Sequence, residues 1–517
     1  MFKQFASVGG LTLLSRLSGF ARDVVMADVL GAGRLADAFL VALRIPNNFR
    51  QIFAEGAFNA AYVPAYTRLQ VQKGPEAARQ FFAQLYSLLL MSQLILLAIA
   101  WAFMPQIISL IAPGYRSDPG KFALAETMTR ITFPYLTCIV LVTLHSATLN
   151  ANRKFAAAAA VSILLNLCII GFLAVAYLFP NAGIAASVGV LVAGFVQLAF
   201  IILAARRAGL SESLAMPRWN ADIKHFFRVL GPAVIGSAGL QIAIFVDTIL
   251  ASTLGNGAQS SINYADRLYL LPIGVIGVAA GTVLLPEMSR RHSQGNVAGA
   301  HAAQNTTLTV TWALTAPFFI AFLTIPDLLL NAAYVRGKFT IADAMAAGQV
   351  LWAYGLGIMA VVSVRSAVAS FQAVGDLRTP MYASLIAIGT NVALKLVLIK
   401  PFGVAGLALA TAAGAWINLF LLIHLARRRS LMRFDDALLK TLACTINAAL
   451  WLAVIVRGAY EPIARLASHF GHFAAISQVL LLALAGGLVY GGLMITQLRL
   501  LSVEVPVLDR FMRRRAR

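Results

Sequence analysis

Charged residues recur inside the apolar segments at the start of this chain. The stretch LLSRLSGFARDVVMADVL (residues 13–30) carries Arg16, Arg22 and Asp23 in a sequence otherwise fit to cross a bilayer. A charged side chain at the bilayer centre costs about 2.5–3.5 kcal/mol on insertion scales, so residues of this kind usually serve a function. A guanidinium group can hold a phosphate through two parallel hydrogen bonds, which an ammonium group cannot. The arginines therefore favour phosphate or pyrophosphate as the ligand.

The polar residues of these segments gather on one face when each segment is drawn as a helix. In the first segment that face contains Thr12, Ser15, Arg16, Gly19, Arg22 and Asp23. In the second it contains Asp37, Arg44, Asn48, Gln51 and Glu55, with Arg50 beside it after Pro46. In the eighth segment Asp266 and Arg267 share a side with several glycines. We expect these faces to line an internal space, where Gly19 leaves room for a bulky group or a close helix.

By depth, Arg16, Arg22, Arg44 and Arg50 fall in the middle of their segments, Asp37, Asp266 and Arg267 near the outer end and Glu55 near the inner end. We interpret this pattern as a basic central chamber with acid-containing gates at its two rims. The predicted substrate-binding residues are Arg16, Arg22, Arg44, Arg50 and Arg267, together with Ser15 and Gly19. The predicted gating or ion-pairing residues are Asp23, Asp37, Glu55 and Asp266. The alternative is that these charges form structural ion pairs between neighbouring helices.

Two further buried charges, Asp247 and Lys395, fall in the seventh and eleventh segments and are predicted to form a structural salt bridge. A site for a coupling cation is the alternative, but Lys395 would repel a cation. The chain has no nucleotide-binding loop, no metal-ligand spacing and no nucleophile motif. We therefore expect no cofactor, no metal site and no enzymatic reaction.

The composition indicates the elements that position these residues. Of 517 residues 60% are hydrophobic and only 12% are charged, which is typical of an all-α polytopic membrane protein. The apolar segments number about fourteen. They cover approximately residues 5–30, 36–62, 82–112, 123–149, 156–179, 182–205, 229–254, 260–288, 304–330, 345–372, 380–399, 402–425, 437–456 and 474–498.

The positive charges indicate the orientation. Lys and Arg number 41 against 20 Asp and Glu, which could suggest nucleic acid as a partner. However, about three times as many of these cations fall in connections on the side of the N-terminus as on the opposite side. This bias predicts that both termini lie in the cytoplasm, excludes nucleic acid as the explanation, and makes the terminal RRRAR an anchor on anionic membrane lipids.

An internal repeat divides the chain. The motif around Arg153 and Asn166 returns around Arg378 and Asn391, and PNAGIAASVG (from residue 180) is similar to PFGVAGLALA (from residue 401). The sequence therefore predicts two parallel six-helix lobes, residues 1–208 and 209–430, with a cytoplasmic amphipathic linker before the second. Residues 431–517 hold two further helices and a basic tail. Two similar lobes can enclose a central space and rock about it.

Four motifs give this sequence a family resemblance. SRLSGFARD (15–23), GAGRLADAFLVALRIPNNFRQIFAEGAF (31–58), YADRLYLLPIGVIGVAAGTVLLP (264–286) and GDLRTP (375–380) resemble the MurJ (MviN) family of lipid II flippases, within the MOP exporter superfamily. The resemblance extends over essentially the whole chain. It implies that cavity arginines fall at Arg16, Arg22, Arg50 and Arg267 and acidic partners at Asp23, Asp37, Glu55 and Asp266, with Arg44 where many relatives carry lysine. It also implies that the last two helices form a groove for the lipid tail.

The function that the resemblance implies is movement of lipid II, a disaccharide-pentapeptide on a polyprenyl pyrophosphate, for peptidoglycan synthesis. Alternating access would carry it from the cytoplasmic to the periplasmic leaflet of the bacterial inner membrane. Membrane lipids are the other expected partners, and a partnership with cell-wall synthesis proteins stays open. The alternatives are another MOP-type exporter, such as an O-antigen-like flippase of polyprenyl-linked oligosaccharides, a membrane enzyme acting on polyprenyl pyrophosphates, and a scaffold for cell-wall synthesis.

Overall fold

The computed structural model describes residues 2–52, 57–210 and 215–501. Within these ranges the chain is helical and contains no strand, only an isolated bridge between Arg336 and Phe339. The chain divides into two compact units. Unit 1 comprises residues 1–260 and the short segment 336–340, and unit 2 comprises residues 261–335 and 341–517.

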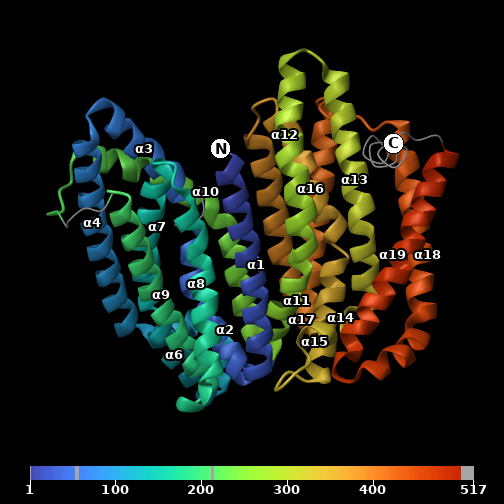
Figure 1. Cartoon of the computed structure of the whole chain (residues 1–517), viewed down its shortest axis with the longest axis horizontal. Coiled ribbons are helices and arrows are strands. Elements are labelled where there is room, and N and C mark those ends of the chain that lie inside the picture. Colours follow the sequence, from blue (N-terminus) through green and yellow to red (C-terminus); the bar gives the residue numbers. More distant parts are fainter. Residues whose placement is uncertain (1, 53–56, 211–214, 502–517) are drawn as a thin grey trace. The chain divides into compact units, whose positions relative to one another are not determined.

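Unit 1 is a bundle of helices of unequal length (Figure 1). Its helices are α1 (Phe2–Leu30), α2 (Arg34–Ile52), α3 (Phe58–Gln72), α4 (Pro75–Ala102), α5 (Met104–Ile111), η2 (Pro113–Ser117), α6 (Pro119–Thr132), α7 (Pro134–Ala151), α8 (Phe155–Ala174), η3 (Ala176–Leu178), α9 (Ala182–Arg207) and α10 (Ala221–Ser252). Helix α8 packs against both α1 and α9, and α2 packs against α6. These contacts bring α1 and α2, which carry the predicted arginines, against the core of the unit.

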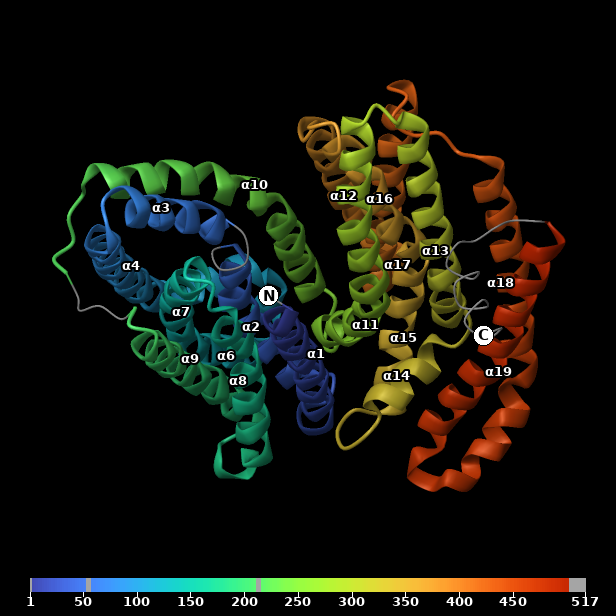
Figure 2. The same ribbon diagram turned by 45° about the horizontal axis from the view of Figure 1, so that its top comes forward.

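Helix α10 lies along α3 (Figure 2). The contact is aromatic: Phe226 of α10 meets Phe58 of α3 edge-on with ring centroids 5.5 Å apart, and Tyr62 stacks on Phe58 at the same spacing. All three rings are almost fully buried. Such pairs contribute about 0.5–1.5 kcal/mol beyond the area that they bury, so α10 is held firmly against α3.

Unit 2 has the same all-helical character. Its helices are α11 (Ala258–Pro272, of which the first three residues belong to unit 1), a π-helical turn η4 (Ile273–Gly277), α12 (Val278–Ser293), α13 (Val297–Thr324), α14 (Pro326–Tyr334), α15 (Ile341–Gly355), α16 (Ile358–Gln372), α17 (Arg378–Arg428), α18 (Asp436–Ala467), η5 (Ser468–Phe473) and α19 (Ala474–Leu500). The helices α18 and α19, red in Figure 1, run side by side, and α18 also packs against α13.

Short polar residues start many of these helices, as capping rules predict. The side chains of Asp118, Asn181, Asn220, Asn296 and Asp435 each accept a hydrogen bond from a backbone N–H in the first turn of the following helix. Each satisfies a donor that would otherwise have no partner at the end of an apolar helix.

The number of spans agrees with the prediction of about fourteen. Within the described ranges, nine continuous helical runs are long and apolar enough to cross a membrane. The run 378–428 contains two predicted segments joined at Gly403, whose φ of 54° and ψ of −130° break the helix. The run 436–500 contains the last two predicted segments. The three remaining segments coincide with α1, with α2 and α3, and with α10. The charges on α1 and α2 lower their hydropathy.

Candidate functional site

Arg22 lies at the centre of a polar network between α1 and α8. Its Nε and Nη2 donate to Oδ1 of Asp23 at 3.1 and 2.7 Å, and its Nη1 donates to Oδ1 of Asn166 at 3.1 Å. Asp23 is 2% exposed, and Arg22 is buried as well. The guanidinium is therefore neutralised by the next residue of its own helix and fixed by an amide from α8, whereas the alternative expected an ion pair between neighbouring helices.

The small residues of the α1 stripe face the same asparagine. Nδ2 of Asn166 donates to the Ser18 hydroxyl at 2.9 Å and to the carbonyl oxygen of Ser15 at 3.3 Å. A Cβ placed on Gly19 would lie 3.6 Å from that same Nδ2. Of the two uses predicted for Gly19, the structure shows the close approach of a neighbouring helix, α8.

Arg16 and Arg44 have a different environment. Arg16 is exposed and takes part in no ion pair with any residue that the structure describes. Arg44 is half-buried, and its Nη1 donates to the hydroxyl of Thr248 on α10 at 2.9 Å. A guanidinium has five N–H donors, so a single hydroxyl leaves most of the donor capacity of Arg44 for other acceptors. Arg50, also half-buried, donates from Nε and Nη2 to Oδ1 of Asn47.

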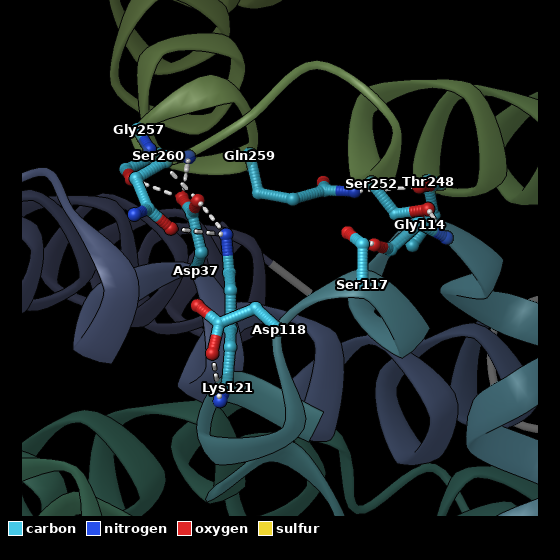
Figure 3. Close-up of polar contacts among 11 residues, drawn as sticks. Asp37, Gly114, Ser117, Asp118, Lys121, Thr248, Ser252, Gly257, Gln259 and Ser260 are labelled. Carbon is cyan, nitrogen blue, oxygen red and sulfur yellow. Dashed lines mark hydrogen bonds and ion pairs between the residues drawn. The ribbon is translucent and has the colours of Figure 1, made fainter.

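Asp37 is the acceptor in a buried polar cluster of unit 1 (Figure 3). Its carboxylate is 0% exposed and contacts Nζ of Lys121 at 2.8 Å. It also accepts from the backbone N–H groups of Gly257 at 2.8 Å and Ser260 at 2.9 Å, and from the Ser260 hydroxyl at 2.5 Å. Gly257 directly precedes α11 and Ser260 lies in its first turn, so Asp37 caps a helix that is distant in sequence.

Lys121 completes this cluster from α6. Its ammonium group also donates to Oδ1 of Asn256 at 3.0 Å and lies 4.3 Å from the ring centroid of Tyr115. Only 3% of the side chain is exposed. Three kinds of partner, a carboxylate, an amide oxygen and an aromatic face, thus replace the water that the ammonium loses on burial.

A second contact holds the same end of unit 1 together. The backbone N–H of Gly114 donates to the Ser252 hydroxyl at 3.1 Å, and Nε2 of Gln259 donates to the carbonyl oxygen of Thr248 at 2.7 Å. A Cβ on Gly114 would lie 2.2 Å from the Ser252 carbonyl oxygen, so glycine is required for η2 to approach the end of α10 this closely. These contacts, seen together in Figure 3, fix the turn between α10 and α11.

The role of Lys121 was not predicted, because the residue falls between the apolar segments 82–112 and 123–149. The structure places this residue in a helix and buries it against Asp37, 84 residues away along the chain. The one available signal was Asp37 itself, because a carboxylate inside an apolar helix requires a cationic or hydrogen-bonding partner. By contrast, the ion pair of Glu126 and Arg130, with Nη2 2.9 Å from Oε1, follows directly from the i,i+4 spacing of one helix.

The other predicted residues lie elsewhere. Asp266 and Arg267 are half-buried on α11 in unit 2. Asp247 is on α10 in unit 1, whereas Lys395 is fully buried on α17 in unit 2, so their salt bridge stays a prediction. Glu55 lies outside the described residues.

Comparison with known proteins shows to which family this chain is similar. A sequence profile described as "Lipid II flippase MurJ" matches residues 26–497. A "Probable lipid II flippase MurJ" of Rhizobium meliloti (strain 1021) is 39% identical over 466 residues, which are 88% of this chain and 87% of that protein. The "Lipid II flippase MurJ" of Burkholderia cenocepacia is 32% identical over 463 residues, 88% of this chain and 89% of that protein.

The chain belongs to the lipid II flippase MurJ family. A solved structure of a lipid II flippase MurJ in an inward closed conformation is similar to this chain, with a TM-score of 0.79 and 25% identity, and the match covers 96% of this chain and 99% of that one. An inward-facing MATE family transporter of the MOP superfamily shares the fold, with a TM-score of 0.67, 14% identity and coverage of 82% of this chain and 97% of the other.

Membership in the MurJ family confirms three predictions made from the sequence. The fold is an all-helical membrane bundle of the MurJ and MATE type. The protein is a multi-pass membrane protein. It is a transporter and not an enzyme, since both its sequence relatives and its structural neighbours are transporters. The roles predicted for individual arginines and carboxylates stay predictions.

Proposed function

We propose that this protein moves lipid II from the cytoplasmic to the periplasmic leaflet of the bacterial inner membrane by alternating access, and so supplies cell-wall synthesis. The observation that carries the proposal is the match to lipid II flippases over residues 26–497, with relatives that align along most of their own length. A bare diphosphate cannot cross hydrocarbon because the loss of hydration costs many kcal/mol. The protein must therefore provide substitute donors along the way.

The arginines of α1 and α2 are suited to provide them. Arg16 is exposed and Arg44 contacts one neutral hydroxyl, so both can turn guanidinium donors toward a diphosphate. Arg22 is held by Asp23 and Asn166, which fixes its position and leaves two of its five donors for substrate. We assign Arg50 and Arg267 to the same ligand, with Ser15 and Gly19 allowing the close packing of α1.

The carboxylates are assigned to the gates. Asp37 caps the start of α11 while it neutralises Lys121, which suits a contact that closes the outer end of the pathway. Asp266 is assigned to the same end, Asp23 to the support of Arg22, and Glu55 to the inner end. Segments α18 and α19, which pack on α13 and α14, are assigned to the lipid tail.

Orientation and driving force complete the proposal. The excess of Lys and Arg in the connections on the side of the N-terminus supports a cytoplasmic location of both termini. A membrane potential that is negative inside then favours outward movement of the anionic head group by about 2.3 kcal/mol per charge per 100 mV. If flipping persists after the potential is collapsed in cells, this driving force is wrong.

Depletion of the protein followed by measurement of the leaflet that lipid II occupies tests the function. We expect lipid II to accumulate, chemically unchanged, in the cytoplasmic leaflet. Normal lipid II exposure, with a different polyprenyl-linked oligosaccharide retained inside, would instead indicate another exporter of the MOP superfamily. Disappearance of lipid II into a modified product would indicate an enzyme.

A further inference from the structure

Unit 2 contains a pocket of about 440 Å³ that the proposed transport path does not use. It lies where α14, α15 and the break in α17 meet, and these helices pack on one another. The residues that line it include the acidic Asp327, the amide residue Gln349 and the aromatic residues Trp352 and Phe402. The volume falls in the range of about 300–1,000 Å³ that is usual for small-ligand sites.

The side chains that line the pocket are complementary to an ammonium group. Trp352 and Phe402 are 40% and 54% exposed, so their faces are accessible to a ligand. A cation over such a ring is stabilised by the ring quadrupole, by about 0.5–2 kcal/mol depending on exposure. Asp327 supplies the counter-charge, and it forms no ion pair with any residue in the described part of the chain.

Gly348 on α15 leaves the space that the carboxylate of Asp327 occupies. A Cβ at Gly348 would lie 1.9 Å from Oδ1 of Asp327, so only glycine lets the carboxylate rest there. Its neighbour Gln349 lines the pocket beside it. Asp327 and the two aromatic residues thus line the same pocket, which offers a small cationic group both a carboxylate and aromatic rings.

The surroundings of the pocket indicate that the ligand is a lipid. Leu396 and Val397, just before the break in α17, are 56% and 65% exposed, as expected of a surface that faces acyl chains. Lys400, also exposed, directly precedes Pro401 of the pocket and can meet a phosphate. A zwitterionic head group offers an ammonium to Asp327 and a phosphate to Lys400, with its acyl chains along α17.

We propose that this pocket binds a zwitterionic phospholipid, whose head group carries an ammonium. The break at Gly403 separates two membrane spans, and the second of them ends at its other extremity in Arg427 and Arg428. The pocket is thus at the membrane surface opposite those arginines. Under the proposed orientation this is the periplasmic leaflet, whereas binding itself does not depend on the transport function.

Native mass spectrometry of the purified protein with dioctanoyl phosphatidylethanolamine, phosphatidylglycerol and phosphatidylcholine tests the proposal. We expect phosphatidylethanolamine and phosphatidylcholine each to bind at least tenfold more tightly than phosphatidylglycerol, and D327N to abolish this preference. W352L is expected to weaken phosphatidylethanolamine binding severalfold. G348A, which displaces the carboxylate, should act like D327N, and E461Q, which alters an exposed carboxyl on α18 outside the pocket, should leave binding unchanged.

Three outcomes would overturn the proposal. They are equal binding of phosphatidylethanolamine and phosphatidylglycerol to the wild type, an unchanged preference in D327N, and tight binding of dissolved phosphoethanolamine without any binding of phosphatidylethanolamine. Thermal unfolding of each variant shows whether it is folded. If D327N is unfolded, W352L and G348A decide, because neither removes a charge. Since no flipping is measured, failure of this test leaves the proposed transport function untouched.

Discussion

Two regions of unit 1 place charged side chains within apolar helices, but they differ in how far the protein neutralises them. Asp37 is fully buried and accepts from Lys121 and from three donors at the start of α11. Arg44 is half-buried and contacts one hydroxyl, and Arg16 is exposed. Both regions place charge within apolar helices, but only the first neutralises it fully. We call a charge saturated when the protein supplies its counter-charge and hydrogen-bond partners, and unsaturated when most of its donors have no such partner. The contrast suggests that saturated charges stabilise the structure, whereas unsaturated cations can bind an anion that the protein itself does not supply.

Arg22 falls between these extremes. It is buried and paired with Asp23, yet its hydrogen bonds in the described part of the chain use only three of its five N–H donors. It should therefore affect both stability and substrate binding, and substitutions can separate these contributions.

The largest loss of stability is expected from D37A. The substitution leaves the ammonium of Lys121 buried without a counter-charge and uncaps α11, which should cost about 3–5 kcal/mol. The midpoint of thermal unfolding in detergent measures it. The control is D118N, which removes the exposed ion pair between Asp118 (37% exposed) and Arg34 (45% exposed) but keeps an oxygen that can cap α6, so its effect should be below about 1 kcal/mol. Equal effects of the two substitutions would contradict the contrast between saturated and unsaturated charges.

A smaller loss is expected from R22A. Asp23 would keep its burial but lose its charged partner, at about 1.5–3 kcal/mol. A double-mutant cycle with D23N should give a coupling energy above about 1 kcal/mol, measured by the same unfolding assay. Strict additivity would mean that the pair does not stabilise α1.

R44A should change stability by less than about 1 kcal/mol, since it removes one hydrogen bond to a neutral hydroxyl. Its effect should appear in growth complementation, which we expect to fail because a diphosphate contact is lost. T248A removes the same hydrogen bond and keeps the arginine, so it should complement. Failure of both variants would show that the bond, and not the cation, is what matters.

The smallest effect concerns pH and a loop outside the membrane. Hydrogen bonds from the side chain and backbone of Thr379 and from Arg429 lower the pKa of Asp376 from 3.8 to about 2. Because the folded-state pKa is below the unfolded one, this carboxylate stabilises the fold above about pH 4. The contribution is lost as the pH falls through about 2.

Comparison of thermal midpoints at pH 5 and pH 3 checks this prediction. T379V should raise the pKa of Asp376 toward its ordinary value and flatten the pH dependence, while D376N should remove it. An unchanged slope in D376N would assign the pH dependence to other groups.

The fold could be predicted from the sequence because apolar segments of spanning length are local features. The segments that coincide with α1, α2 and α10 were predicted in the same way as the others, although α1 and α2 carry charges that lower their hydropathy. The family could be predicted as well, from long motifs such as residues 31–58, and the comparisons confirm it.

The candidate site was harder to predict. The pair of Glu126 and Arg130 follows from helical spacing, whereas Lys121 meets Asp37 only through the packing of α6 on α2. Likewise, Asn166 of α8 organises one side of α1, which periodicity alone had assigned to an internal space. Periodicity identifies a polar face, but tertiary contacts decide what that face meets.

The most direct test of the central claim is the affinity of the purified protein for lipid II, measured by native mass spectrometry for the wild type, R16A, R44A and the T248A control. If unsaturated guanidinium groups hold the diphosphate, R16A and R44A should each weaken binding about tenfold or more, a loss of about 1.4 kcal/mol, while T248A binds normally. Wild-type affinity in both folded arginine variants would contradict the account.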